Sequence, residues 1–292
     1  MNTKLNPEPY ADAYPGVLYR LISKFGLTNA TNMHWFFRPE KGMNFGDWIG
    51  PYLFNKMTGK RARLRKAKGP WSYQIFSCGS ILSHIEAPDK AIVWGSGALT
   101  ECAQFERPKK IFAVRGPMSR EICLSQGYDC PEVYGDPGVL MPLFYKPSKH
   151  ERKVALGIVP HHTEFDDLFE KFSGCEGAKI VDVRQPLETV ISEISACKAI
   201  VSTSLHGVII SHAYNIPVAW AKFSGRLIGD EFKFKDYFLG VGSDAIPSPV
   251  NLNKDYGIDD LLEFAIGGEI PDLVCVQDRL LKSCPFNSKG AF

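Results

Sequence analysis

The stretch Ala-Ile-Val-Ser-Thr-Ser-Leu-His-Gly, residues 199–207, decides the fold class of this chain. Residues 199–201 form a short apolar run typical of a buried strand, and residues 205–214 carry the pattern of a helix. Ser202, Thr203 and Ser204 occupy the junction, where hydroxyl side chains are expected to cap the helix start. A strand followed at once by a helix predicts an α/β fold.

The same alternation extends in both directions along the chain, which favours parallel sheets flanked by helices. Strands are predicted at residues 33–37, 73–76, 91–94, 111–114, 132–134, 154–159, 179–183, 199–201 and 218–221. Helices are predicted at residues 47–57, 117–126, 165–172, 187–197, 205–214 and 259–266.

A polar stretch without apolar periodicity, residues 145–153, divides the pattern and is interpreted as a linker. We therefore expect two Rossmann-like domains facing a cleft, in a GT-B-like arrangement. Their predicted limits are residues 1–146, the probable acceptor side, and residues 147–292, the probable donor side. The last helix has room to pack back on the first domain.

Composition excludes several functional classes. The 292 residues are 45% hydrophobic and 23% charged, as in a soluble globular protein, and the net charge of +2 does not indicate a nucleic-acid partner. No apolar run reaches the roughly 18 residues that span a bilayer, and residues 1–15 do not resemble a signal peptide. Eight scattered cysteines without a Cys-x-x-Cys pair predict a reducing cytoplasm and no zinc or other metal site.

One basic cluster spans residues 60–68. Its simplest interpretation is a solvated loop. The functional alternative is a peripheral contact with a membrane surface or an anionic acceptor.

The junction at residues 202–205 predicts an anion-binding site. A helix start carries about half a positive charge and free N–H groups, and ligands of α/β sheets lie at the carboxyl ends of strands. The expected donor contacts there are Ser202, Thr203, Ser204 and Leu205. His206 stands in the first turn and is the candidate proton donor, with a buried structural imidazole as the alternative. His212 faces away from it and is interpreted as structural.

Other candidates follow other predicted strands or begin helices. Asp47 is a helix cap or a base for a sugar hydroxyl. Arg115 is a two-pronged anion ligand or a structural ion pair. His161 and His162 point opposite ways in an extended chain, so one is expected to face the cleft and His161 is taken as a donor contact. The candidate acceptor contacts, each with a turn or cap as its alternative, are Asn44, Gly95, Ser96, Gly97 and Asp136.

Several stretches together resemble the polysaccharide pyruvyl transferase family, and most closely its branch of exopolysaccharide ketal-pyruvate transferases. They are residues 44–47 (NFGD), 93–97 (VWGSG), 114–119 (VRGPMS), 134–140 (YGDPGVL), 157–162 (GIVPHH), 203–207 (TSLHG) and 216–217 (IP). Their number and order make the resemblance specific over residues 33–240.

The resemblance implies phosphoenolpyruvate as donor, a sugar or lipid-linked oligosaccharide diol as acceptor, a pyruvate ketal as product, and no cofactor. For this reaction we expect His206 to protonate the donor and Asp47 to take the hydroxyl proton. The family's Arg-Leu-His donor motif is here Ser204-Leu205-His206. The missing cation is then expected from Arg115, Arg184 or Arg226; the alternative is that the helix start alone holds the anion.

Two other functions share this fold class, because a fold does not fix a function. One is a GT-B-type glycosyltransferase that uses a nucleotide sugar. The other is an inactive carbohydrate-binding protein, which the serine at position 204 favours.

Overall fold

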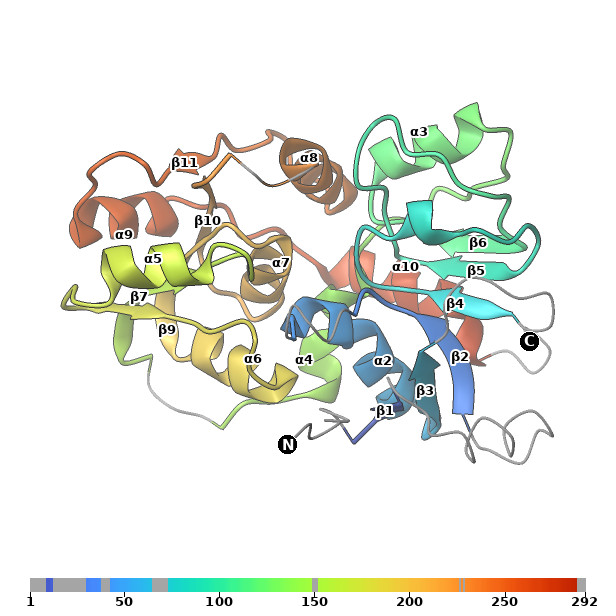
Figure 1. Cartoon of the computed structure of the whole chain (residues 1–292), viewed down its shortest axis with the longest axis horizontal. Coiled ribbons are helices and arrows are strands. Elements are labelled where there is room, and N and C mark those ends of the chain that lie inside the picture. Colours follow the sequence, from blue (N-terminus) through green and yellow to red (C-terminus); the bar gives the residue numbers. More distant parts are fainter. Residues whose placement is uncertain are drawn as a thin grey trace.

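The computed structural model describes residues 9–12, 30–37, 43–64, 73–148, 152–225, 227 and 229–287. In these residues the chain forms two sheets with helices packed on them (Figure 1). Every pairing between the described strands is parallel. The predicted α/β class is confirmed.

The first sheet has the strand order β1-β3-β2-β4-β5-β6. Its strands are β1 (Ala11–Asp12), β2 (Ala30–His34), β3 (Arg61–Leu64), β4 (Gln74–Phe76), β5 (Ala91–Trp94) and β6 (Lys110–Ala113). The helices of this half are α2 (Phe45–Thr58), η2 (Leu82–His84), α3 (Pro117–Ser125), η3 (Pro137–Leu140) and α4 (Met141–Phe144).

The second sheet has the order β11-β10-β9-β7-β8. Its strands are β7 (Val154–Val159), β8 (Ala178–Ile180), β9 (Cys197–Ser202), β10 (Val218–Lys222) and β11 (Val250–Asn251). The helices after the linker are α5 (Phe165–Phe172), α6 (Leu187–Ser195), α7 (Leu205–Ala213), α8 (Asp230–Gly240), α9 (Ile258–Ile266), α10 (Val274–Ser283) and η4 (Pro285–Asn287).

Strand β9 shows why its sequence is apolar at consecutive positions. Successive side chains of a strand point to opposite faces of the sheet. Ala199 and Val201 join an apolar cluster with Leu261 of α9, whereas Ile200 packs in another cluster with Ile194 of α6. Both faces of β9 are therefore covered by helices, as in parallel sheets generally.

One apolar cluster contains residues of both sheets. It includes Trp94 of the first sheet and Ile200 of the second, together with Trp48 and Ile49 of α2. The C-terminal segment returns to the first sheet, where Trp94 Nε1 donates a hydrogen bond to the carbonyl of Leu280 at 3.1 Å. The predicted domain limits stay a prediction, since a shared core does not mark a boundary.

Several local expectations need correction. The solvated loop predicted for the basic cluster is wrong at Arg61–Leu64, because these residues form β3 inside the first sheet. The side chain of Arg63 is buried and donates a hydrogen bond to Asn32 Oδ1. Residues 65–68 lie outside the described residues, so membrane contact stays a prediction.

Residues 132–134 form a single bridge, Val114 with Tyr134, instead of a strand. Helices α8 and α10 were not predicted. None of the described helices has the length and apolarity needed to cross a bilayer.

Candidate functional site

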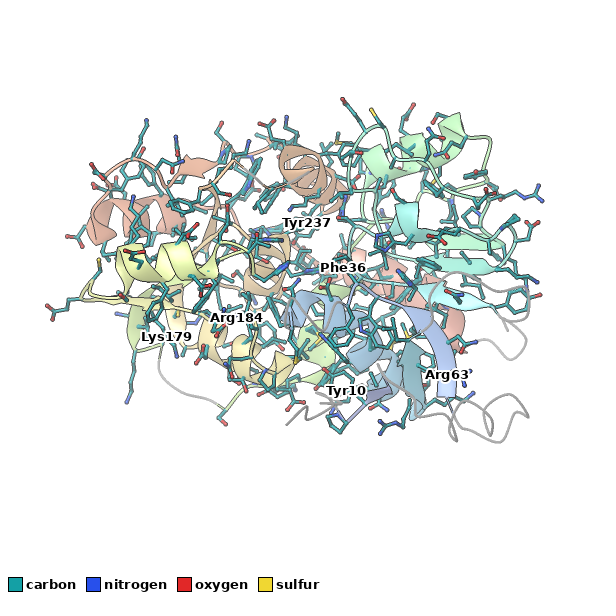
Figure 2. All side chains as sticks on the ribbon, viewed as in Figure 1. Tyr10, Phe36, Arg63, Lys179, Arg184 and Tyr237 are labelled. Atoms are coloured by element: carbon teal, nitrogen blue, oxygen red, sulfur yellow. The ribbon has the colours of Figure 1, made fainter. Side chains whose placement is uncertain are left out.

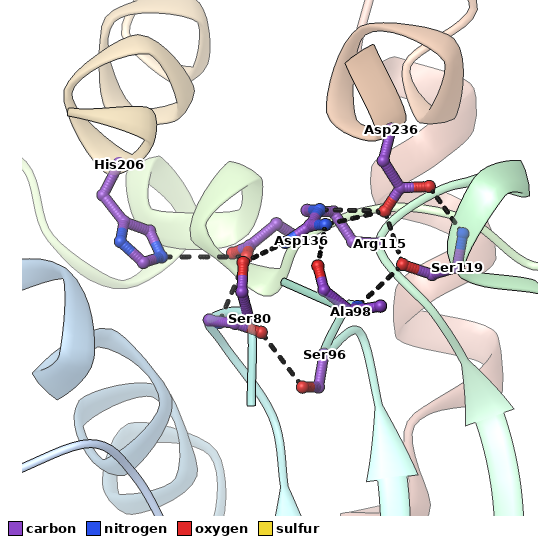
Figure 3. Close-up of polar contacts among 9 residues, drawn as sticks. Ser80, Ser96, Ala98, Arg115, Ser119, Asp136, His206 and Asp236 are labelled. Carbon is purple, nitrogen blue, oxygen red and sulfur yellow. Dashed lines mark hydrogen bonds and ion pairs between the residues drawn. The ribbon is translucent and has the colours of Figure 1, made fainter. Parts of the chain in front are cut away.

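The first turn of α7 lies where the carboxyl ends of the two sheets approach each other. The loops after β4, β5 and β6 come from one side, and the loop after β9 comes from the other (Figure 3). The short helix η3 packs against both α2 and α7, so three helix starts converge here. Converging N-termini place partial positive charge and N–H groups around one point.

His206 is the residue of α7 that faces this point. It is 8% exposed, and its Nε2 lies 3.7 Å from Oδ2 of Asp136. The imidazole rests on the backbone of α2: a Cβ atom added at Gly46 would lie 2.1 Å from Nδ1. Gly46 is therefore required by the close approach of the ring. No hydrogen bond satisfies Nε2, which leaves the ion pair with Asp136 as its polar contact in the described residues.

Asp136 is a fully buried carboxylate at the N-cap of η3. Its Oδ1 accepts a hydrogen bond from the backbone N–H of Gly138 at 2.8 Å. Burial raises the pKa of Asp136, but the nearby positive charge of His206, together with the hydrogen bond from Gly138 and the charge of Arg115, brings this pKa below its ordinary value. An ionised Asp136 places a negative charge 3.7 Å from Nε2 of His206. Its predicted contact with the acceptor stays a prediction.

Asp47 is the second carboxylate near His206. It is in the first turn of α2, and its Oδ2 accepts a hydrogen bond from Asn44 Nδ2 at 3.0 Å. Burial raises its pKa to about 7, against the opposing effects of the charge of His206 and the hydrogen bond from Asn44. Asn44 stands at the N-cap of α2 but makes no capping bond with its side chain. The site thus contains one ionised carboxylate and one that titrates near neutrality.

The hydroxyl residues before α7 do not cap it, which corrects that expectation. The Oγ of Ser202 lies 2.9 Å from the carbonyl of Val159 and 2.8 Å from that of Ser204, so it braces the loop. Thr203 Oγ1 accepts the backbone N–H of His161 at 2.8 Å. Ser204 is the N-cap residue, but its side chain makes no cap hydrogen bond. The N–H groups of the first turn, including that of Leu205, therefore donate no hydrogen bond to the side chain of Ser204.

His161 lies at the carboxyl end of β7, beside the loop that leads into α7. Burial, followed by the positive charges of His162, Lys233 and His206, lowers its pKa to about 3. His161 is therefore neutral at pH 7, and its Nδ1 is 2.8 Å from Thr163 Oγ1. Lys233 of α8, which is 7% exposed, brings positive charge to this region. Lys233 has no local sequence signal, because the helix α8 that carries it was not predicted.

Arg115 is a buried ion-pair residue in this structure. It is wholly buried; its Nε donates to Asp236 Oδ2 at 2.9 Å, and its two other nitrogens donate to Ser80 Oγ and to the carbonyl of Ala98. Asp236 also accepts from Ser119 (Figure 3). This geometry matches the structural alternative, and a donor contact would require the guanidinium to leave Asp236.

The remaining candidate arginines are Arg184 and Arg226. Arg184 binds Asp182 and Asp166, and Arg226 lies outside the described residues. His212 is interpreted as structural from its position, and its Nδ1 lies 3.0 Å from the hydroxyl of Tyr237. Tyr237, which is labelled in Figure 2, belongs to α8.

The loop at residues 95–97 is filled by protein atoms. A Cβ atom at Gly95 would lie 2.2 Å from Cδ of Pro137, and one at Gly97 would lie 2.4 Å from Cζ of Arg115. Ser96 is buried and donates to the carbonyl of Gly79 at 3.0 Å. These small residues make room for neighbouring protein groups, and their acceptor contacts stay predictions. Among the described residues, no three His, Cys, Asp or Glu side chains are placed to hold a metal ion.

The fold and this site define an α/β protein with a histidine–carboxylate centre between two parallel sheets. The family model described as polysaccharide pyruvyl transferase matches residues 17–221, and the chain belongs to this family. It is 30% identical over 209 residues to an uncharacterised protein, L143, of Acanthamoeba polyphaga mimivirus; the match covers 69% of this chain and 72% of the relative. No solved structure matches the chain.

Proposed function

We propose that this protein transfers the pyruvyl group of phosphoenolpyruvate to two hydroxyls of a sugar in an exopolysaccharide or surface glycan, forming a cyclic ketal and releasing phosphate. The observation that carries the proposal is the His206–Asp136 pair at 3.7 Å, with Asp47 on the adjacent helix. Membership of the polysaccharide pyruvyl transferase family supports the class of reaction.

The donor is proposed to bind at the first turn of α7. Phosphoenolpyruvate carries a carboxylate and a phosphate, both suited to free N–H groups at a helix start. The backbone of residues 202–205 would hold one of these groups, and neutral His161 would hydrogen-bond to it. Lys233 would supply the positive charge that the family's arginine supplies elsewhere. Arg115 would take part only in a state in which it is released from Asp236.

The proposed chemistry begins with His206 as an imidazolium. It donates its proton to the methylene carbon of the donor, which becomes a methyl group, and positive charge develops on the central carbon. A first sugar hydroxyl forms a C–O bond there and loses its proton to Asp47. A second hydroxyl then attacks the same carbon, the C–O bond to phosphate breaks, and the second proton leaves with the phosphate.

The two carboxylates suit different steps. Asp136 has a lowered pKa and would stay ionised to stabilise the imidazolium. Asp47 has a pKa of about 7 and would accept a proton near neutral pH, as a general base should. Their environments therefore favour different protonation states within one site.

The acceptor is proposed to lie between the two halves, near Asn44 and the loops at residues 95–97 and 135–138. A GT-B-like arrangement of two domains around a cleft is part of this proposal. The proposal also includes a cytoplasmic location and an acceptor that is presented at a membrane surface.

The test is an assay of phosphate release from phosphoenolpyruvate in the presence of a set of oligosaccharides, with mass spectrometry of the glycans. We expect phosphate release together with a glycan that has gained pyruvate minus water. Stabilisation by nucleotide sugars alone would identify a glycosyltransferase instead; a ligand at a hundred times its Kd adds about 2.7 kcal/mol to stability. Glycan binding without phosphate release would identify a binding protein.

A further inference from the structure

Helix α10 packs against the segment that carries Asp136. This helix, red in Figure 1, returns from the second half of the chain to the first sheet. A Cβ atom added at Gly135 would lie 2.8 Å from Cδ1 of Leu280 and 2.8 Å from Cγ1 of Val276, two side chains of α10. The helix is therefore in direct contact with the backbone one residue before the carboxylate.

Gln277 of α10 donates a hydrogen bond to η3, the short helix whose N-cap residue is Asp136. Its Nε2 lies 2.8 Å from the carbonyl oxygen of Val139. This carbonyl has no donor in its own 3-10 register, because the residue three positions on is Pro142, which has no N–H. Val139 is wholly buried, and a buried carbonyl without a donor costs free energy. Gln277 thus supplies, from 138 residues away, a hydrogen bond that the local sequence cannot provide.

The placement of η3 decides where the carboxylate of Asp136 points. Its Oδ1 accepts the backbone N–H of Gly138, in the first turn of η3, at 2.8 Å. Its Oδ2 lies 3.7 Å from Nε2 of His206. A Cβ atom at Gly138 would lie 2.9 Å from Cγ2 of Ile209, so η3 also touches the helix of His206. A displacement of about 1 Å at η3 would change the facing of carboxylate and imidazole, and such a misplacement can cost about 10²-fold in rate.

We infer that Gln277 is a positioning residue for the reaction: by holding the carbonyl of Val139, it fixes η3 and keeps Asp136 facing His206. The effect on the rate rests on the proposed function, whereas the placement of Asp136 is measured without it. Gln277 lies beyond residues 17–221, the stretch that the family model matches. Its role therefore comes from the packing of the C-terminal helix and from no motif of the family.

The experiment compares two substitutions at position 277. Gln277→Met keeps an unbranched side chain and a similar helix propensity but has no hydrogen-bond donor. Gln277→Lys keeps a donor, because an ammonium group carries three N–H bonds. Arg279→Met, at an exposed position of the same helix, is the matched control.

The first measurement is phosphate release from phosphoenolpyruvate, with the oligosaccharide that supports the fastest release by the unmodified protein. We expect kcat to fall about 10- to 100-fold in Gln277→Met. The KM for phosphoenolpyruvate should stay within about twofold, because the proposed donor contacts at residues 202–205 are untouched. Gln277→Lys should recover most of the lost rate, and Arg279→Met should keep all of it.

The second measurement is hydrogen exchange of the Gly138 amide, followed by NMR. This amide is bonded to Asp136, so its exchange reports the placement of the carboxylate without donor or acceptor. It should exchange about tenfold faster in Gln277→Met, while the amides of β9 keep their rates. Gln277→Lys should restore slow exchange.

Unchanged exchange of the Gly138 amide in Gln277→Met would overturn the inference, and so would an unchanged kcat in an active enzyme. Equal losses in Gln277→Lys or in Arg279→Met would also overturn it, since the donor at position 277 would then not be responsible. The expected exchange in a protein that releases no phosphate would support the positioning of Asp136 and contradict the proposed function.

Discussion

The Nε2 atom of His206 lies 3.7 Å from Oδ2 of Asp136, although the two residues follow strands of different sheets. Each is nearly or wholly buried, so their charges are weakly screened. The pair therefore both joins the two halves of the chain and provides the candidate acid. Substitutions in the pair are therefore expected to change both activity and stability.

The first prediction concerns His206→Gln. Removing the proposed proton donor should lower the rate of phosphate release about 10²- to 10⁴-fold, with the circular dichroism spectrum unchanged. The matched control is His212→Gln, because His212 lies on the same helix but hydrogen-bonds to Tyr237. The control should lose stability and keep its rate per folded molecule. A wild-type rate in His206→Gln would refute the role given to the imidazole.

The second prediction uses the close approach of Gly46 to His206. Gly46→Ala places a methyl group 2.1 Å from Nδ1, so the imidazole must move away from its present position. Activity should fall at least tenfold, even though alanine favours a helix by up to about 1 kcal/mol over glycine. Gly174→Ala is the control, since nothing lies within 4 Å of a Cβ atom there. Equal activities of the two variants would contradict the prediction.

The third prediction follows from Asp47, whose pKa rises from 3.8 to about 7 on folding. Between these values the folded protein binds a proton that the unfolded chain has released, so stability falls as pH rises from about 4 to about 7. Asp47→Asn should remove this loss and be more stable than the unmodified protein at pH 8, by at most about 4 kcal/mol.

Urea unfolding at pH 5 and pH 8 measures this effect. Asp244→Asn, at an exposed position, should show the pH dependence of the unmodified protein. The same dependence in Asp47→Asn would show that this carboxylate is not the source.

The fourth prediction concerns the buried pair of Arg115 and Asp236. Asp236→Asn leaves a buried guanidinium without its counter-charge, which should cost about 3–5 kcal/mol in the free energy of unfolding. Asp89→Asn breaks the exposed pair of Arg107 and Asp89, whose side chains are 64% and 54% exposed, and should cost far less because water screens the two charges. Similar losses in the two variants would show that burial does not control the strength of these pairs.

The fifth prediction is a single unfolding transition. Because one apolar cluster includes Trp94, Ile49 and Ile200, loss of one half exposes the core of the other. Near-ultraviolet and far-ultraviolet circular dichroism should report the same midpoint in a thermal melt. Two separated transitions would indicate halves that unfold independently.

The sequence allowed several elements to be predicted to the residue, including the strands at Ala91–Trp94 and Val154–Val159 and the helix at Phe165–Phe172. These segments have strong local signals, namely apolar runs or a helical period. The strand Arg61–Leu64 was not predicted, because its two arginines give it the polar composition that is typical of a solvated loop. The helix Asp230–Gly240 was not predicted, because its many charged residues obscure the apolar periodicity of its buried face in the sequence.

The candidate site was predicted in part for the same reason. The strand-to-helix junction before His206 and the helix start at Asp47 are local patterns, and both are present. The pairing of His206 with Asp136 has no local signal, since it depends on how two sheets approach each other.

By itself, the sequence determined the α/β class, the family motifs and the position of His206 at the start of a helix, because periodicity and turn chemistry act over a few neighbouring residues. Only the tertiary structure decided that Arg115 binds Asp236, that Asp47 titrates near pH 7 and that Asp136 faces His206. Burial and distance between remote segments set these charges and partners, and neither quantity is written in a local pattern.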